Sequence, residues 1–440
     1  MEENLRLSVL VSAHEVSPVL GSECSSGWNI LTRLGEHHDL TILYAETNQF
    51  KTNNYKFEVE KFLKENSYIK GKFLSIPQPK ITRLIAKFNH FISGPKTSVG
   101  IPPLYFLGVY FWERSVLKIA KHLHKFNNYD LVHHFNHLSY REPGFLYKLN
   151  LPIIWGPMSG TSNLPYPFLD GKPLSFKIKF IVRNCLNSLR NNFSLRIGRS
   201  IKRASKILFV TSDDKLFLQS KGASSFRASL DVGTNLQREE NFSSPLDKKN
   251  QSDLNLIWIG RLDYLKSLDL LLEALASDAK LASKTKLSVI GDGELLSVLK
   301  KKALDLELNN VTWHGLIEHN QVINLMLQAD ILVHTSIKEA GSAVVLESLS
   351  AGLPVICHDA FGFSHTINDK CGIKIPFRTP SESIMGFQRA ILKCVEDSDL
   401  VASMKQGAIQ RASDFTWESL AKSISDDYLE VIQREKYRKV

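Results

Sequence analysis

Two acidic residues, Glu339 and Glu347, lie eight residues apart in the segment 331–357, which reads ILVHTSIKEAGSAVVLESLSAGLPVIC. The apolar start of the segment is typical of a buried strand, Glu339 falls in the loop that follows, and a helix is expected to begin near Gly341-Ser342. The start of a helix offers free backbone N–H groups and a positive dipole end, so Gly341 and Ser342 suit a diphosphate. Glu347 can accept hydrogen bonds from both hydroxyls of a ribose, and Glu339 can accept them from another sugar. The segment therefore predicts a site for a nucleotide joined to a sugar, whereas either glutamate alone would fit an ordinary surface charge.

A pair of basic residues follows a second strand-like run, which ends in Ile259-Gly260-Arg261-Leu262. Lys266 comes five residues after Arg261, on the first turn of the next expected helix. Arginine offers a planar fork of donors and lysine a compact charge, and together they can neutralise a departing diphosphate. Taken alone, the pair would fit a solvated strand end, but with the two glutamates it indicates one site for phosphate and sugar.

The spacing E-x7-E, followed by L-x-x-G-x-P-V-I, resembles the donor-site signature of retaining glycosyltransferases with the GT-B fold, of the family 4-like type found in bacterial polysaccharide assembly. The resemblance implies that Glu339 contacts the transferred sugar and that Glu347 contacts the ribose. It also assigns Arg261 and Lys266 to the leaving diphosphate, as the residues that stabilise its charge.

The chain departs from the family pattern at two places. Many members read E-G-F-G where this chain has Glu339-Ala340-Gly341-Ser342, and Ser267 replaces the last glycine of G-R-L-x-x-x-K-G. The residues in the first motif are still small, so the backbone can approach a ligand, and the change can alter which sugar fits.

Weaker matches add residues to the predicted donor site. The turn 289–294 contains Gly291 where the family has G-x-G, although two glycines after a strand occur in many α/β folds. The family packs the base against the loop after the following strand, which implies a contact with Ile317. Gly21, ahead of the first expected helix, resembles the family loop that closes over the donor phosphates and the acceptor. With Gly260, these residues complete the predicted donor site.

Three histidines lie in or just after an expected buried strand, in the segment 129–137 that reads YDLVHHFNH. Family members read D-V-V-H-x-H there, and one of their histidines faces the reaction centre. The pattern is shifted in this chain, so we predict His134 for that role and keep His133 and His137 as alternatives. A histidine on a buried strand is otherwise usually structural.

The elements that must position these residues alternate between strand-like apolar runs and helical patterns, which is typical of parallel α/β sheets. Both halves of the chain show this alternation, so we predict two Rossmann-like domains with parallel sheets that face a central cleft, as in the GT-B fold. The candidate strands are 5–12, 40–45, 131–135, 152–155 and 207–211 in the first half, and 254–259, 286–290, 311–314, 331–335 and 354–358 in the second.

The boundary between the two domains is placed in the segment 235–253, which is polar, contains Pro245 and lacks periodicity. Residues 1–240 are expected to form the acceptor domain and residues 254–410 the donor domain. Residues 411–440 resemble the last segment of the family, a helix that crosses back to the first domain.

The composition is that of a globular protein, with 43% hydrophobic and 23% charged residues. No segment supplies the ~20 apolar residues of a membrane span, and the start of the chain lacks the pattern of a signal peptide. The five cysteines are scattered without a C-x-x-C pair, so neither a disulfide framework nor a zinc site is expected. These features predict a cytoplasmic protein.

The net charge of +10 is uneven, since residues 1–240 contribute +13 and residues 241–440 contribute −3. Residues 171–212 contain ten basic residues and residues 66–112 contain six, with no acidic residue in either span and many large apolar side chains. Such a surface suits anionic lipid headgroups, so we expect peripheral binding to the inner face of the cell membrane. A solvated basic helix face is the alternative, and no nucleic-acid-binding motif is found.

These patterns together predict the transfer of a sugar from a nucleotide-sugar donor to a saccharide or lipid-linked saccharide, with retained anomeric configuration and without a metal or other cofactor. No D-x-D motif follows a strand, and Asp213-Asp214 is expected to begin a helix. Two alternatives are a two-domain ligand-binding protein and a catalytically inactive homologue that acts as an assembly partner. The presence of all four charged residues of the predicted site argues against the second.

Overall fold

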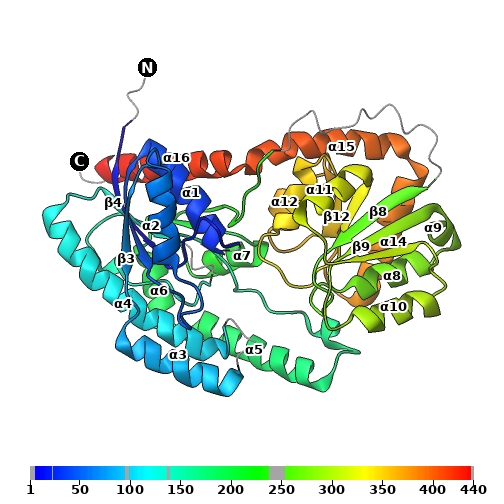
Figure 1. Ribbon diagram of the computed structural model, residues 1–440, viewed down its shortest axis with the longest axis horizontal. Coiled ribbons are helices and arrows are strands. Elements are labelled where there is room, and N and C mark those ends of the chain that lie inside the picture. The colour runs from blue at the N-terminus through cyan, green and yellow to red at the C-terminus, as the bar shows by residue number, and fades with distance from the viewer. Residues whose placement is uncertain (1–4, 22, 95–98, 136–138, 237–252, 438–440) are drawn as a thin grey trace. The chain divides into compact units, whose positions relative to one another are not determined.

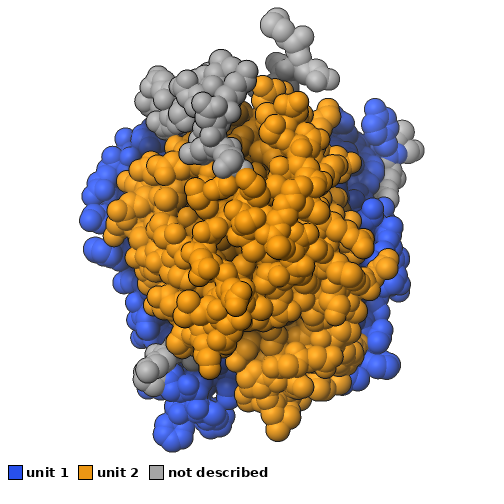
Figure 2. Space-filling view, turned by 90° about the vertical axis from the view of Figure 1, so that its right-hand side faces the viewer, with its two compact units in different colours: residues 1–162, 189–232, 417–440 blue, residues 163–188, 233–416 orange. Residues whose placement is uncertain are grey.

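The computed structural model describes residues 5–21, 23–94, 99–135, 139–236 and 253–437. The chain forms two compact units, coloured separately in Figure 2: unit 1 contains residues 1–162, 189–232 and 417–440, and unit 2 contains residues 163–188 and 233–416. Each unit has one parallel sheet with helices, which confirms the expected architecture of two Rossmann-like domains. None of the helices in the described ranges is both long enough and apolar enough to cross a bilayer.

The sheet of unit 1 has seven strands in the order β3-β2-β1-β4-β5-β6-β7, and all neighbouring strands are parallel (Figure 1). The five central strands are buried on both faces, as expected for a parallel sheet covered by helices, whereas the edge strands β3 and β7 are partly buried. The elements are β1 (Ser8–Ala13), α1 (Glu23–His37), β2 (Asp39–Ala45), α2 (Tyr55–Glu65), β3 (Lys72–Ile76), α3 (Lys80–Ser93), α4 (Pro102–Phe126), β4 (Leu131–Phe135), β5 (Ile153–Met158), α6 (Leu195–Arg203), β6 (Lys206–Phe209), α7 (Ser212–Ser220), β7 (Phe226–Ala228) and α16 (Trp417–Tyr437).

The sheet of unit 2 has six strands in the order β10-β9-β8-β11-β12-β13, again all parallel. Its elements are β8 (Leu254–Ile259), α8 (Leu268–Ala276), α9 (Ala279–Lys284), β9 (Thr285–Ile290), α10 (Leu296–Asp305), β10 (Val311–Gly315), α11 (His319–Gln328), β11 (Ile331–His334), α12 (Ala343–Ser350), β12 (Val355–His358), α13 (Phe363–Thr366), β13 (Gly372–Ile375), α14 (Pro380–Glu396) and α15 (Ser398–Ala412). Helix α5 (Leu174–Phe193) continues from unit 2 into unit 1.

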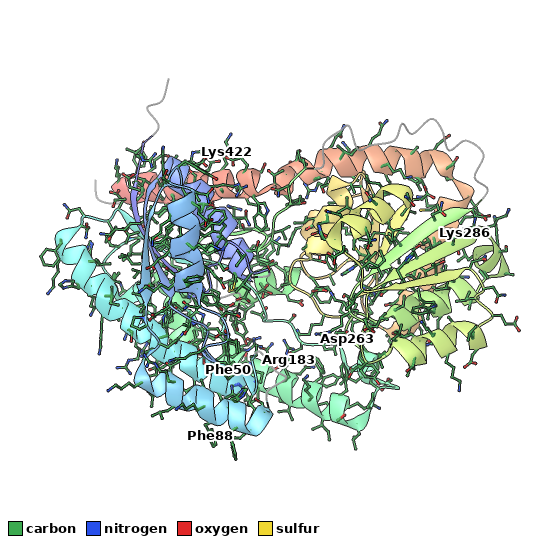
Figure 3. All side chains as sticks on the ribbon, viewed as in Figure 1. Phe50, Phe88, Arg183, Asp263, Lys286 and Lys422 are labelled. Carbon is green, nitrogen blue, oxygen red and sulfur yellow. The ribbon has the colours of Figure 1, made fainter. Side chains whose placement is uncertain are left out.

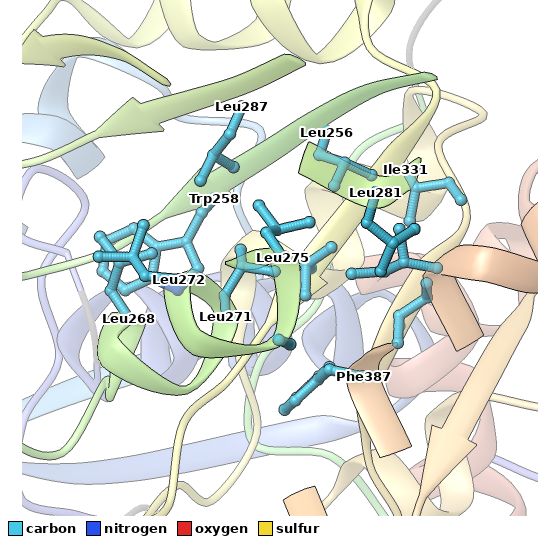
Figure 4. Packing of buried hydrophobic residues seen from close by; sticks show 14 of the residues in the cluster. Leu256, Trp258, Leu268, Leu271, Leu272, Leu275, Leu281, Leu287, Ile331 and Phe387 are labelled. Carbon is cyan, nitrogen blue, oxygen red and sulfur yellow. The ribbon is translucent and has the colours of Figure 1, made fainter. Parts of the chain in front are cut away.

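The core of unit 2 lies between its sheet and the helices α8 and α14. Leu256 and Trp258 of β8 pack there with Leu271 and Leu275 of α8 and with Phe387 of α14 (Figure 4). This packing explains the sequence of α8, LDLLLEALA, in which most residues are apolar and buried. The strand β8 is therefore held by α8 and α14 on this face of the sheet.

Residues 163–188 leave unit 1 and belong to unit 2. Phe168 and Phe180 of this excursion form an apolar cluster with Leu270 of α8 and Ile337, which follows β11. The sequence alone places all residues up to 240 in the first domain, because nothing in the local pattern of 163–188 reveals its packing partners. Residues 237–252, which include most of the expected linker, lie outside the described residues.

The last helix, α16, packs on α1 within unit 1. Ser425 of α16 contacts the ring Nε2 of His38 at 2.8 Å, and Asp427 accepts a hydrogen bond of 2.9 Å from Nε of Arg227. These buried polar contacts tie the end of the chain to the sheet of unit 1.

Candidate active site

Two loops of unit 2 meet at the carboxyl ends of the neighbouring strands β8 and β11. In chain order, β8 is the first strand of this sheet and β11 the fourth, yet the two are neighbours in the sheet, and their junction is the switch point where α/β folds bind ligands. The backbone N–H of Ile337 donates to the carbonyl of Leu265 at 2.8 Å, and the hydroxyl of Thr335 donates to the carbonyl of Lys266 at 2.7 Å. The two loops are therefore fixed to each other by their own backbones.

Lys266 and Glu339 form an ion pair between these two loops. The ammonium group of Lys266 donates to Oε1 of Glu339, and the hydroxyl of Ser336 donates to the same oxygen at 3.0 Å. The ring Nε2 of His334, at the end of β11, lies 3.7 Å from this oxygen. The structure thus brings together two of the residues predicted from the sequence, and it adds His334 and Ser336 as their supports.

The surroundings of Glu339 keep its carboxyl group ionised. Burial alone would raise the pKa of Glu339, but the contacts with His334 and the ammonium of Lys266 outweigh it and lower the pKa to about 2. Burial lowers the pKa of His334, so its ring is neutral near pH 7. Among the described residues, every hydrogen bond and ion pair of Glu339 falls on Oε1, which leaves Oε2 for a hydroxyl of a bound sugar.

Arg261 is held by a residue that the sequence analysis did not select. Its Nε donates to Oδ2 of Asp263 at 2.6 Å, and its side chain is 73% exposed. The other oxygen of Asp263 accepts from the backbone N–H groups of Leu265 and Lys266 at 2.9 and 3.0 Å. Asp263, labelled in Figure 3, therefore shapes the turn before α8 and orients Arg261. In the sequence, this role could have been recognised from an aspartate that lies two or three residues before the N–H groups of a turn.

The helix α12 begins where the sequence predicts, with Ser342 as its N-cap residue and Glu347 in its second turn. The hydroxyl of Ser342 makes no capping bond, so it does not cover the N–H groups of the first turn. Gly341 precedes it in the same loop as Glu339. Oε1 of Glu347 lies 3.3 Å from the ring Nε2 of His319, the first residue of α11, which was not predicted to take part.

Two of the predicted donor-site glycines, Gly260 and Gly291, lie in loops that approach each other closely. The backbone N–H of Gly260 donates to Ile290 at 3.0 Å, and that of Gly291 donates to Gly315 at 2.9 Å. Gly291 has φ +133, and a Cβ atom there would overlap the carbonyl oxygen of Gly260. Glycine at 291 is thus needed for packing between loops, whatever it contributes to a ligand. Ile317, half-buried, follows β10 two residues before His319.

Ser267 occupies the place where the family pattern has glycine. It has φ 46 and ψ 50, in the left-handed region, and it is buried. Glycine adopts this conformation without steric cost, whereas other residues do so at roughly 1–2 kcal/mol. The hydroxyl of Ser267 donates to the carbonyl of Tyr264 at 2.8 Å, which offsets part of that cost. Ser267 thus adopts the backbone conformation that glycine, the residue of the family pattern, favours.

In unit 1, His134 is buried in a polar cluster. Its Nε2 donates to the carbonyl of Glu142 at 3.0 Å, and its Nδ1 lies 3.9 Å from Oε1 of Glu113. Burial raises the pKa of Glu113 to about 8 and that of Glu142 to about 7, although Arg196 pairs with Glu142 at 2.6 Å. Burial also lowers the pKa of His134 to about 4. This neutral ring is enclosed within its own unit, and its predicted role at the reaction centre stays a prediction.

The two alternative histidines differ in what the structure describes. His133 has both ring nitrogens occupied, with Nε2 donating to Gly156 at 2.8 Å and Nδ1 accepting from the hydroxyl of Tyr428 at 2.6 Å. These partners fix His133 as a link between β4 and α16. His137 lies outside the described residues. Gly21 is exposed in the loop between β1 and α1, and it also stays a predicted donor-site residue.

Comparison with known proteins shows which family a part of the chain resembles. Residues 239–411 match the model of the family described as glycosyl transferases group 1. An alpha-monoglucosyldiacylglycerol synthase of Streptococcus pneumoniae is 34% identical over 116 residues, which is 26% of this chain and 26% of that protein. The uncharacterized glycosyltransferase MJ1069 of Methanocaldococcus jannaschii is 23% identical, over 73% of this chain and 94% of the relative.

The fold of the whole chain is similar to that of a solved sucrose-phosphate synthase from Thermosynechococcus elongatus. The TM-score is 0.60 at 15% identity, with 98% of this chain and 100% of the other covered. The chain spans about a quarter of the length of the pneumococcal relative, over 116 aligned residues. Residues 239–411 are therefore similar to the glycosyl transferases group 1 family, and the chain has the GT-B fold.

Proposed function

We propose that the chain is a retaining glycosyltransferase that moves a sugar from a nucleoside-diphosphate sugar to a saccharide acceptor. The observation that carries this proposal is the ion pair of Lys266 and Glu339 between the loops after β8 and β11. These loops occupy the sheet position where α/β folds bind nucleotides. The pair also lies inside the segment that matches the glycosyl transferases group 1 family.

In the proposed step, the bond between the anomeric carbon and the diphosphate oxygen breaks, and the acceptor oxygen bonds to the same carbon. Negative charge grows on the diphosphate as it leaves, so a cation at that place stabilises the transition state more than the bound donor. Lys266, Arg261 and the N–H groups at the start of α12 supply positive charge. Glu339 positions Lys266 and accepts a hydrogen bond from the sugar, while Glu347 binds the ribose.

We further propose that the product keeps the donor's anomeric configuration, with the acceptor proton passing to an oxygen of the leaving phosphate. A double displacement would need a second carboxylate about 5 Å from the first. Glu339 is ion-paired with Lys266 and accepts a hydrogen bond from Ser336, so we propose that it binds the sugar and does not act as a nucleophile. Because lysine, arginine and helix amides offset the diphosphate charge, the proposed step uses no metal.

The exposed face of helix α3 is an argument for the proposal that the acceptor is linked to a lipid. On its inner face, Thr82 and Asn89 bond through their side chains to the backbone carbonyls of Gly108 and Val99. Its outer face is apolar, and Phe88 is labelled there in Figure 3. The large exposed apolar side chains of this helix are Ile81, Leu84, Phe88, Phe91 and Ile92.

No acidic residue lies in the surrounding segment 66–112, and the pneumococcal relative is named for a glucosylated diacylglycerol. Apolar side chains beside basic ones suit an anionic bilayer surface. We therefore propose that the acceptor is a lipid-linked saccharide of cell-surface polysaccharide synthesis. The protein would reach it by peripheral binding at the cytoplasmic face of the membrane.

Hydrolysis of nucleotide sugars without an acceptor tests the proposed activity. We expect purified protein to release free sugar and nucleoside diphosphate slowly from one donor of a panel, in the presence of EDTA. The same nucleoside diphosphate should raise the melting temperature, because it binds the folded state. Glu347→Ala should need more nucleotide for the same stabilisation. Stabilisation by a donor without any hydrolysis would instead identify a ligand-binding protein or an inactive homologue.

A further inference from the structure

The face of α5 that packs against the rest of unit 2 is polar. The side-chain amide of Asn184 donates to the carbonyl of Leu164 at 2.8 Å, and its oxygen accepts from the N–H of the same residue at 3.1 Å. The amide of Asn187 donates to the side chain of Asn163 at 3.0 Å. Both asparagines are buried, and Phe180 is the one apolar residue of α5 buried with them. The helix is thus attached through these side-chain hydrogen bonds together with the packing of Phe180.

The outer face of α5 is apolar over its whole length. At ~100° per residue, the exposed side chains share a stripe of about 140° of the helix circumference. Lys179, Arg183 and Arg190 lie along one border of this stripe, and Lys177 lies along the other. The large apolar residues of the stripe, between 41% and 75% exposed, are Leu174, Ile178, Ile181, Val182, Leu186, Leu189 and Phe193.

This arrangement is the reverse of an ordinary surface helix, which buries its apolar stripe and exposes its amides. An exposed apolar stripe of this size marks a surface that another body covers. The basic borders favour an anionic body, since residues 171–193 contain no acidic residue. Of the ten basic residues in 171–212, Lys172, Arg196 and Lys206 are ion-paired within the chain and do not contribute to this surface. A second copy of this chain would bring the same basic borders against this one. An anionic bilayer offers both the negative charge and an apolar layer beneath it.

We propose that α5 is a membrane-docking helix that lies in the surface of an anionic bilayer and attaches unit 2 to it. The inference rests on the proposed lipid-linked acceptor and extends it, because unit 2 carries the donor site. A helix of this length spans about 30 Å at 1.5 Å per residue, so it can lie along the bilayer surface. Bilayer contact would then bring the donor-binding unit to the lipid.

The N-terminal end of α5 also contacts the loop after β8, which is part of the predicted donor site. The ring of Phe176 lies 5.2 Å from that of Tyr264, between centroids, and Lys172 pairs with Asp269 at 2.9 Å. Tyr264 lies between Asp263 and Lys266 in the loop after β8. Docking of α5 on lipid therefore places the bilayer next to the segment that holds the leaving-group cations.

Cys185 provides a reporter for this proposal. It is exposed on the apolar stripe, whereas the other four cysteines are buried, so a polarity-sensitive fluorophore can be attached to it selectively under native conditions. We expect a blue shift of the fluorophore with vesicles that contain phosphatidylglycerol. The shift should be smaller with phosphatidylcholine alone, and it should weaken in high salt, because screening reduces the attraction of the basic borders.

A pair of variants makes the test specific to α5. Ile178→Gln with Val182→Gln should weaken co-sedimentation with phosphatidylglycerol vesicles by about tenfold or more, since two apolar anchors are lost. The control, Val298→Gln with Leu304→Gln, removes two equally exposed aliphatic residues from α10 of the same unit and should leave binding unchanged. Circular dichroism and the melting temperature check that both proteins fold.

The proposal is overturned if the fluorophore gives no shift with any vesicle, or if both double variants lose binding equally. A doubled mass in sedimentation that is lost with the α5 variant would assign the stripe to a second copy instead. Hydrolysis of the donor is measured on the same proteins without vesicles. Intact hydrolysis with failed docking therefore refutes this inference alone, and failed hydrolysis with intact docking refutes the proposed activity alone.

Discussion

Replacement of Lys266 by alanine is expected to lower kcat by about 10²-fold or more, as for the loss of one donor to a transition-state charge. Lys266 is the cation fixed at the switch point of unit 2 by its ion pair with Glu339. The loss should fall on kcat more than on nucleotide affinity, because the charge on the diphosphate grows as the bond breaks. Steady-state kinetics with the donor found in the panel measure both quantities. Arg261→Ala should act in the same direction.

Lys280→Ala is the matched control for this experiment. Lys280 forms an exposed ion pair of 2.6 Å with Glu396 in the same unit, and both side chains are about half exposed. Exposed pairs contribute roughly 0–1 kcal/mol, so this variant should keep both kcat and stability. Wild-type kinetics in the alanine variants of both Lys266 and Arg261 would show that the leaving-group site is misassigned.

Replacement of Gly291 by alanine is expected to destabilise the protein by about 3 kcal/mol or more. The added Cβ would overlap the carbonyl oxygen of Gly260, a backbone atom that cannot move without disturbing β8. The φ of +133 at this position is also in a region that residues with a side chain rarely adopt. Calorimetry should show a melting temperature lower by roughly 6 °C or more, with the scale set by a domain of this size.

Gly198→Ala provides the contrast for that measurement. Gly198 lies inside α6, and a Cβ there would meet no atom within 4 Å. Alanine in a helix interior is favoured over glycine by roughly 0.5–1 kcal/mol, so this variant should be as stable as the wild type or slightly more so. An unchanged melting temperature in Gly291→Ala would mean that the loops after β8 and β9 do not approach as closely as described.

Local patterns in the sequence were sufficient to predict the central strands. The apolar runs 131–135 and 254–259 coincide with β4 and β8, and the helix after Glu339 begins at the predicted place. Buried central strands of a parallel sheet have continuous apolar sequences, which makes them recognisable. Of the four strands at sheet edges, β10 was predicted, whereas β3, β7 and β13 are short and only partly buried and were not named from the sequence.

Contacts over long sequence distances could not be predicted in this way. The assignment of residues 163–188 to unit 2 depends on the packing of Phe168 and Phe180 with Ile337. The polar inner face of α5 adds to this difficulty, because the usual rule assigns the apolar stripe of a helix to the core. The boundary expected at the linker therefore misses an excursion that local periodicity does not reveal.

The charged residues of the candidate site could be predicted from the sequence, but the residues that pair with them could not. E-x7-E and the G-R-L-x-x-x-K motif identify residues by type and spacing, and the structure joins Lys266 to Glu339. The pairing of Arg261 with Asp263 depends on the turn before α8, which the motif does not describe. Likewise, the polar cluster that buries His134 includes Glu113 of α4, a residue that lies outside the motif around His134.

The anomeric configuration of the transferred sugar is the most direct test of the central claim, that this site performs a retaining transfer without a metal. Nuclear magnetic resonance of the first product formed from a donor of known configuration, with EDTA present, measures it. We predict the same anomeric configuration in product and donor, at a rate that EDTA leaves unchanged. An inverted product, or a reaction abolished by EDTA and restored by manganese, would contradict the account.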